Sequence, residues 1–140
     1  MNFLEISTIS AVIASLIFYI VLVIANWKIF TKAGEAGWKS IIPIYNGYIL
    51  YKISWKTSVF WITVVLALIG GILNGIGNPV TSVIGVILNI VVIVIGIMQS
   101  YKLSKAFGHA VGFTVGLVLL PPIFTLILGF GSSEYIGVQE

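Results

Sequence analysis

Residues 28–56 read KIFTKAGEAGWKSIIPIYNGYILYKISWK, and five of the seven lysines of the chain lie in this stretch. The other two, Lys102 and Lys105, lie together much later, and the chain contains neither Arg nor Asp. Long apolar runs flank both groups of lysines. Loops that stay in the cytoplasm collect Lys and Arg, whereas loops that are moved across the membrane do not. The two groups therefore predict two cytoplasmic loops of an integral membrane protein.

The composition of the chain as a whole is typical of a membrane protein. Of its 140 residues, 59% are hydrophobic and 8% are charged, and the mean hydropathy is +1.17. A soluble domain of this length has too little interior to bury so many apolar side chains. We therefore expect lipid to be the solvent of most of the chain.

Four apolar runs are long enough to cross a bilayer, because about 20 residues at about 1.5 Å per residue span a hydrocarbon core of about 30 Å. They predict a single domain, residues 1–140, of the all-α integral membrane class, with four transmembrane helices at about residues 6–27, 58–73, 80–101 and 111–130. The short, uncharged stretch 74–79 predicts that the second and third helices form an antiparallel hairpin.

The charged residues predict how these helices are oriented. Lysine is absent before the first run, between the second and third runs and after the fourth run. Glu5, Glu134 and Glu140 all lie in those lysine-free segments. Four crossings would then place both termini outside and both lysine loops in the cytoplasm.

A shorter apolar stretch, residues 41–53, lies inside the first lysine loop. It is too short to cross the bilayer, so we expect an interfacial or re-entrant helix that begins at Pro43. The alternative is a fifth transmembrane helix, which would place Lys52 and Lys56 outside and reverse the orientation of every later segment.

Small and polar residues predict where the helices pack, since helices in lipid associate through small residues and interhelical hydrogen bonds. One face of the third run and two overlapping G-x-x-x-G units at the start of the fourth run carry such residues. They are Gly85, Asn89, Gly96, Gly108, Gly112 and Gly116. We expect these two helices to pack within one chain, and packing between copies of the chain is the alternative.

The pair Pro121–Pro122 lies in the middle of the fourth run. The two rings remove two backbone donors and crowd the preceding turn, which predicts a kinked helix. Broken helices in transporters use freed carbonyl groups to bind ions, so a gap lined by backbone is the alternative interpretation.

The chain lacks the side chains that most catalytic or metal sites require. It contains no cysteine and one histidine, His109, which excludes a site of several histidine or thiolate ligands within one chain. The pairs Lys39–Ser40 and Ser104–Lys105 are adjacent in sequence, and adjacent residues do not face each other on a helix. We predict no enzymatic activity, no metal and no cofactor. The alternative is an intramembrane enzyme that uses Ser40, Ser104 or His109.

Residues 30–46, FTKAGEAGWKSIIPIYN, resemble a motif, F-x-K-A-G-x-x-G-W…I-P-x-Y-N, of a family of small bacterial multispanning membrane proteins of unknown function. Members of that family often carry a signal peptidase I label. The stretch from Ala106 to Tyr135 is similar to the closing pattern of the same family. The resemblance implies a protein of the bacterial cytoplasmic membrane with a structured first loop. A signal peptidase uses a Ser-Lys pair on the outer face, which does not fit lysines that are expected inside.

The loop motif supplies the candidate binding residues. Trp38 and Lys39 are expected at headgroup depth, and Tyr45 and Asn46 are able to bond backbone groups or a ligand. We predict a non-enzymatic accessory or oligomeric component of the inner membrane that binds membrane lipids or a partner protein through residues 28–56. Nucleic acid is not an expected partner, because anionic headgroups account for the lysines. The alternative is an oligomeric channel or transporter for a small solute or ion.

Overall fold

The computed structural model describes residues 1–139, and the regular secondary structure of this part of the chain is entirely helical. The helices are α1 (Phe3–Lys32), the short 3-10 helix η1 (Gly37–Ser40), α2 (Tyr45–Ser54), α3 (Thr57–Gly75), α4 (Pro79–Ala106), α5 (Val111–Leu119) and α6 (Pro121–Phe130). A segment without regular secondary structure, residues 131–139, follows α6. The predicted all-α fold class is confirmed.

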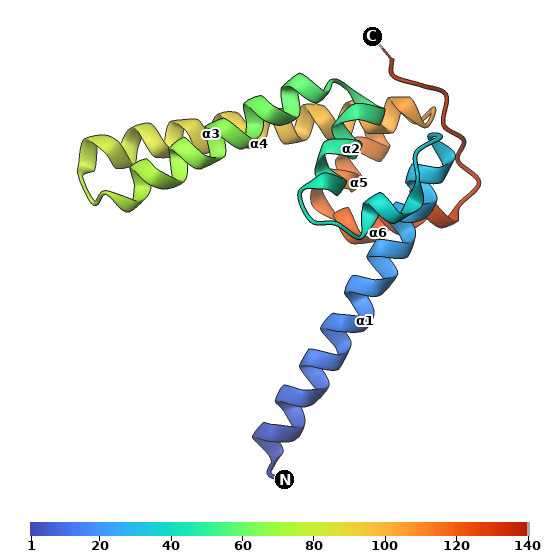
Figure 1. Cartoon of the computed structure of the whole chain (residues 1–140), viewed down its shortest axis with the longest axis horizontal. Coiled ribbons are helices and arrows are strands. Elements are labelled where there is room, and N and C mark those ends of the chain that lie inside the picture. The colour runs from blue at the N-terminus through green and yellow to red at the C-terminus, as the bar shows by residue number, and fades with distance from the viewer. Residues whose placement is uncertain (140) are drawn as a thin grey trace.

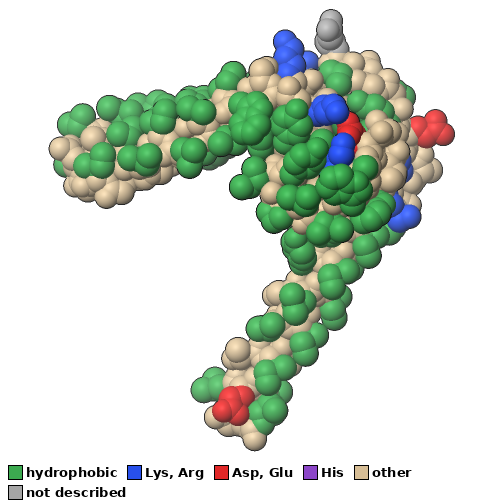
Figure 2. All heavy atoms as spheres, viewed as in Figure 1, with side chains coloured by type: hydrophobic (Ala, Val, Ile, Leu, Met, Phe, Trp, Pro, Cys, Tyr) green, Lys and Arg blue, Asp and Glu red, His purple; other side chains and the backbone are tan. Residues whose placement is uncertain are grey.

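The helices form a head from which two arms extend (Figure 1). One arm is the N-terminal part of α1, and the other is the hairpin of α3 and α4, which extends in a different direction. We define the head as residues 25–61 and 99–139, so that it joins one end of each long helix to η1, α2, α5 and α6. Apolar side chains cover both arms, whereas the lysines gather on the head (Figure 2).

Three helices, α1, α3 and α4, are long and apolar enough to cross a membrane. They contain 30, 19 and 28 residues, and most of their apolar side chains are exposed. The shortest is about 28 Å long at about 1.5 Å per residue, which is close to the thickness of the hydrocarbon core. Length and composition therefore support the first three predicted transmembrane helices.

The fourth predicted transmembrane helix, residues 111–130, is not a single helix. α5 ends at Leu119 and α6 begins at Pro121, and Leu120 between them has φ −131° and ψ 60°. The ring of Pro121 disfavours the helical conformation of the residue before it, so Pro121 and Pro122 begin a new helix where a kink was predicted. Each helix is only about half as long as the bilayer core is thick. The predicted count of four spans is not confirmed.

α5 and α6 fold back on each other as a short helical hairpin within the head. The rings of Phe113 and Phe124 lie edge to face, with 5.1 Å between their centroids. The ring of Phe124 also covers Gly116, where it leaves no room for a Cβ atom. The chain therefore turns back after α5 and does not continue away from the head.

Local signals in the sequence account for where two of the long helices begin. The side chain of Asn2 accepts a hydrogen bond from the backbone N–H of Glu5 at 2.8 Å, and the Glu5 carboxylate accepts one from the N–H of Asn2 at 3.2 Å. These two bonds form a capping box at the start of α1. At the start of α4, the side chain of Asn78 accepts a bond from the N–H of Val80 at 2.8 Å, and Pro79 takes the first helical position.

The two helices of the α3–α4 hairpin approach each other closely where Gly70 faces Gly85. A Cβ atom on Gly85 would lie 3.0 Å from the carbonyl oxygen of Gly70 and would overlap the side chain of Asn74. A Cβ atom on Gly70 would lie 2.9 Å from Asn89 Oδ1. Two of the predicted packing residues, Gly85 and Asn89, therefore lie against α3.

The other predicted packing glycines do not form a surface against which α4 packs. Gly108 lies in the loop between α4 and α5 with φ 77°, a conformation that favours glycine. No atom lies within 4 Å of a Cβ atom built on Gly96 or on Gly112. Gly116 is covered by Phe124 of α6. In the hairpin, Gly70 of α3 lies opposite Gly85 of α4. At this position α4 therefore packs against the second run and not against the start of the fourth run.

We expect Gly85→Ala to destabilise the protein and Gly96→Ala to leave its stability unchanged or to raise it. Overpacking at a close approach costs about 1–3 kcal/mol. Alanine at an open helical position is favoured over glycine by about 0.5–1 kcal/mol. The measurement is thermal unfolding of the two purified variants in mild detergent, followed by far-ultraviolet circular dichroism. Equal stability of the two variants would show that α3 and α4 do not cross at Gly85.

Candidate interfacial site

The head is held together by apolar side chains from segments that are far apart in the sequence. Phe30 at the end of α1 and Leu128 of α6 are fully buried, and so is Ile49 of α2. Leu103 near the end of α4 and Leu117 of α5 belong to the same cluster. Both lysine-bearing regions and the last helix therefore share one core.

The segment 131–139 is bound to the lysine-bearing regions of the head. The hydroxyl group of Tyr135 donates a hydrogen bond to the carbonyl oxygen of Ile53 at 2.7 Å. The backbone N–H of Ile136 donates one to the carbonyl oxygen of Ala106 at 2.7 Å. The end of the described chain therefore lies at the same end of the molecule as both lysine groups. The sequence had predicted it at the opposite end, about 30 Å away across a bilayer.

Two lysines at the end of α1 hold α6 in place. Lys32 Nζ donates hydrogen bonds to the carbonyl oxygens of Leu128 at 2.7 Å and Gly131 at 3.0 Å. Lys28 Nζ lies 5.4 Å from the centre of the Phe130 ring. An ammonium group at the C-terminus of a helix satisfies free carbonyl groups and interacts favourably with the helix dipole. These two lysines therefore have a structural role within the chain.

The backbones of α1 and α6 also touch. A Cβ atom on Gly129 would lie 2.5 Å from the carbonyl oxygen of Ala25, and Ala25 is fully buried. Only a glycine at position 129 permits this approach, which brings the end of α6 within reach of the lysines of α1.

A turn with two specific hydrogen bonds connects α1 to the candidate site. The N–H of Gly34 donates to the carbonyl oxygen of Thr31 at 3.1 Å, and the N–H of Glu35 donates to that of Phe30 at 2.8 Å. This is the Schellman arrangement, which requires a left-handed residue after the helix. Gly34 supplies it with φ 82°. The turn reverses the chain and directs Glu35 back into the head.

Glu35 binds two of the lysines. Lys39 Nζ lies 2.8 Å from Oε2 of Glu35, and Lys52 Nζ lies 2.7 Å from Oε1. The Glu35 side chain is 13% exposed, whereas that of Lys52 is 50% exposed. Hydrogen bonds from Lys39 and then from Lys52 lower the pKa of the Glu35 carboxyl, and the bond to Glu35 raises the pKa of Lys39. The cluster joins η1 to α2 and carries a net positive charge.

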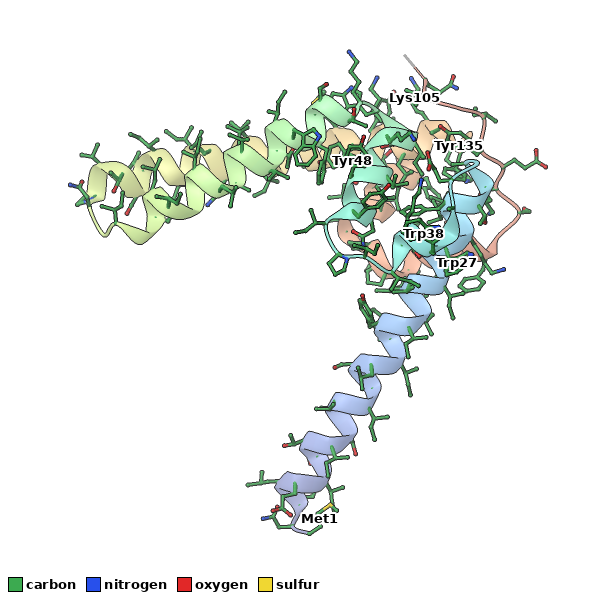
Figure 3. All side chains as sticks on the ribbon, viewed as in Figure 1. Met1, Trp27, Trp38, Tyr48, Lys105 and Tyr135 are labelled. Carbon is green, nitrogen blue, oxygen red and sulfur yellow. The ribbon has the colours of Figure 1, made fainter. Side chains whose placement is uncertain are left out.

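Aromatic side chains form a continuous row beside this charged cluster. Trp38 stacks on Tyr45 with 6.3 Å between ring centroids, and Tyr45 lies 5.9 Å from Tyr48. Tyr48 in turn contacts Phe60 and Trp61 near the start of α3, at 5.8 and 6.0 Å. Figure 3 shows Trp38 and Tyr48 on the head, far from Met1 at the tip of α1. The row thus lies at the end of the molecule that carries the lysines.

Three of the four predicted binding residues, Trp38, Lys39 and Tyr45, lie together. Lys39 Nζ lies 5.9 Å from the centre of the Tyr45 ring, which Trp38 also contacts. The fourth, Asn46, directs its amide back to the carbonyl oxygen of Ser40 at 3.4 Å. Pro43 was expected to begin the short helix, but α2 begins two residues later, at Tyr45.

The candidate catalytic side chains, Ser40, Ser104 and His109, form hydrogen bonds that hold loops of the head together. Ser40 Oγ donates to the carbonyl oxygen of Gly37 at 2.8 Å, while Lys39 binds Glu35. Ser104 Oγ donates to the carbonyl oxygen of Ala110 at 3.0 Å. The ring of His109 pairs with the hydroxyl group of Ser133 at 2.7 Å and stacks on Phe113. These contacts tie loops of the head together, and none of them joins a serine to a lysine.

Four residues that hold the head together were not singled out from the sequence: Lys32, Glu35, Gly129 and Tyr135. Lys32, Gly129 and Tyr135 belong to the residues that resemble the family patterns, so the patterns contained a usable signal for these three. Glu35, in contrast, stands at an unspecified position of the loop motif. The spacing of Glu35 four residues before Lys39 is also typical of an ion pair. The hydrogen bonds of Lys32 and Tyr135 span 96 and 82 residues and leave no local signal in the sequence.

The sequence model of a family described as "Family of unknown function (DUF5684)" matches residues 38–138, and the chain belongs to this family. The matched range covers most of η1, all of α2 to α6 and most of the segment that follows. Membership in a family of unknown function is thus confirmed. The match shows neither the loop motif nor a signal peptidase assignment. No curated protein and no solved structure matches the chain.

We expect the stability of the head to fall in acid because of Glu35. A carboxyl group whose pKa is lowered by folding contributes stability above its ordinary pKa of about 4.3 and loses it as the pH falls through the lowered value. Glu35→Gln should therefore unfold at a lower temperature than the unmodified protein at pH 7, and the two unfolding temperatures should converge as the pH falls through the lowered pKa of Glu35. Thermal unfolding in detergent between pH 7 and pH 3 measures both effects.

The exposed Glu134 offers a matched control for Glu35. Glu134→Gln removes the same charge and should leave the unfolding temperature at pH 7 unchanged. If Glu35→Gln and Glu134→Gln behaved alike over the whole range, Glu35 would not be the acid-sensitive group.

Proposed function

We propose that the protein is a non-enzymatic accessory component of the bacterial cytoplasmic membrane. Three helices cross the bilayer, and the head lies at its cytoplasmic surface, where it binds a membrane lipid or a partner protein through residues 28–56. One observation carries this proposal: a single head contains both lysine groups and the segment 131–139, at the ends of all three long helices.

The distribution of charge supports this orientation. All seven lysines belong to the head, whereas the tip of α1 carries Glu5 and the tip of the hairpin, residues 75–78, is uncharged. Lysine-rich segments are retained in the cytoplasm. Three crossings place the N-terminus outside and the C-terminus inside, in contrast to the prediction of two external termini.

The surface of α6 supports a head that touches the bilayer. Ile123, Ile127 and Phe130 lie on one face of this helix and are 51%, 45% and 51% exposed. The helix is too short to cross the membrane, and an exposed apolar face on a short helix suits the boundary between headgroups and acyl chains. The head therefore lies on the membrane and is partly immersed in it.

Single cysteines test this topology, because the chain has none of its own. Gly75→Cys lies at the tip of the hairpin, where a Cβ atom meets no neighbour, and Glu134→Cys lies in the exposed part of the last segment. In intact bacteria, a maleimide that cannot cross the membrane should label Gly75→Cys and leave Glu134→Cys unmodified.

Permeabilised cells provide the control for accessibility, and both positions should be labelled there. Labelling of Glu134→Cys in intact cells would support four crossings. Protection of Gly75→Cys combined with labelling of Glu134→Cys would invert the whole orientation, and the proposed location of the head would be wrong.

Asn89 favours a second candidate function, in which several copies assemble into an oligomer or a channel. It is exposed on the hairpin ten residues after Pro79, which places it about 15 Å from the tip and near the middle of the bilayer core. An amide in hydrocarbon requires a hydrogen-bonding partner, and a second Asn89 would supply a self-complementary one.

Mass measurement of the protein in mild detergent tests this candidate. An oligomer should dissociate toward the monomer in Asn89→Leu and persist in Ile90→Leu, a control at a neighbouring exposed position. If the unmodified protein is a monomer, both the proposed oligomer and the proposed channel are wrong.

A further inference from the structure

A groove of about 530 Å³ lies between the start of α2 and the start of α3. It is lined by Pro43, Ile44, Tyr45, Tyr48, Phe60 and Trp61. This volume lies within the range of about 300–1,000 Å³ that is typical of small-ligand sites, and mainly apolar walls are typical of them as well. The candidate interfacial site therefore includes a concave surface next to its charged cluster.

The rim of the groove is built on a strained turn. Ile44 has φ 70° and ψ −51°, and the N–H of Tyr45 donates to the carbonyl oxygen of Pro43 at 2.8 Å. This γ-turn with a positive φ is rare, and it is unfavourable for a β-branched residue. Strained residues of this kind occur often where a protein holds a ligand. The turn leaves the Ile44 side chain 73% exposed at the edge of the groove.

Positive charge lies at the Tyr45 end of the groove. Lys39 Nζ is 5.9 Å from the centre of the Tyr45 ring, and Lys39 and Lys52 both bind Glu35. Two ammonium groups share one carboxylate, so one positive charge remains. Each ammonium group has three N–H donors, and Lys52 is half exposed, which leaves donors for an anion.

The other end of the groove lies at the start of α3. Phe60 and Trp61 lie near the start of α3, a helix that is apolar enough to cross the membrane. Under the proposed orientation, an apolar chain in the groove continues along α3 into the hydrocarbon. The site is thus cationic at one end and open to lipid at the other, which matches an anionic amphiphile.

We propose that the groove binds an anionic phospholipid of the cytoplasmic leaflet. An acyl chain lies on Tyr48 and Trp61 below the Ile44 rim, and the phosphate group binds Lys39 and Lys52. This inference rests on the proposed function, since the groove faces the cytoplasmic leaflet only if the head lies at that surface. A zwitterionic lipid fills the groove equally well but matches the net charge of the cluster less well.

Native mass spectrometry of the purified protein tests the proposal with dioleoyl phosphatidylglycerol and dioleoyl phosphatidylcholine in equal amounts. We expect the unmodified protein to retain about fivefold more of the anionic lipid, since one lysine near a membrane surface supplies an attraction of that order. Lys52→Gln should remove the preference. Lys105→Gln, at a lysine of the head that lies over Tyr101 and does not belong to the Glu35 cluster, should keep it.

A second variant separates loss of binding from loss of folding. Ile44→Gly removes the apolar rim and relieves the positive φ, so it should fold at least as stably and retain less of both lipids. Equal retention of the two lipids by the unmodified protein would overturn the proposal. So would unchanged retention in Lys52→Gln or Ile44→Gly, or displacement of the lipid by inorganic phosphate alone.

This measurement is independent of orientation, because lipid in detergent reaches the groove from any side. If the protein shows no preference for the anionic lipid while the cysteine labelling is as expected, the proposed lipid site is wrong and the proposed topology is unaffected. If the protein prefers the anionic lipid but the labelling shows the inverted orientation, the groove binds lipid and faces the outer leaflet.

Discussion

The break in the backbone at Leu120–Pro121 is the constraint on which the arrangement of the chain depends. The proline ring disfavours a helical residue before it, so α5 ends and α6 starts in a new direction. A continuous helix over these residues would carry the end of the chain away from the head. Because the chain turns back, Gly129 meets Ala25, Lys32 reaches the end of α6, and Tyr135 reaches Ile53.

The lysines that indicate sidedness also hold the head together. Lys28 and Lys32 bind the end of α6, while Lys39 and Lys52 bind Glu35. A lysine side chain can indicate sidedness and also stabilise the head, since its apolar stem packs within the head and its ammonium group stays near polar atoms. Within the described chain, the pattern that marks cytoplasmic loops is therefore also part of the tertiary structure.

Local rules predicted the elements well and the long-range contacts poorly. Apolar runs gave the class of protein and three long helices, and the short, uncharged turn before Pro79 gave the hairpin. The pair Pro121–Pro122 predicted a kink, but the residue before a proline more often ends a helix, and α5 does end at Leu119. The position of segment 131–139 depends on pairs such as Tyr135–Ile53, and such pairs have no signature in a single sequence.

The candidate site was also predicted only in part, for a related reason. Trp38, Lys39 and Tyr45 belong to one short stretch, so their proximity follows from the local sequence. Phe60 and Trp61 complete the groove from the next helix, and Lys52 reaches Glu35 from the far end of α2. The direction of these elements is set by the turn at Gly34 and by the strained residue Ile44, neither of which periodicity reveals.

The arms and the head obtain their stability from different sources. Side chains of α1 from Phe3 to Ile20 are exposed on every side, and in lipid such exposure costs little because acyl chains are as apolar as the helix. The head instead combines a buried apolar core with ion pairs, caps and long-range hydrogen bonds. α1 meets the rest of the described chain only through the head. The head is therefore the element that fixes how the two arms are placed relative to each other.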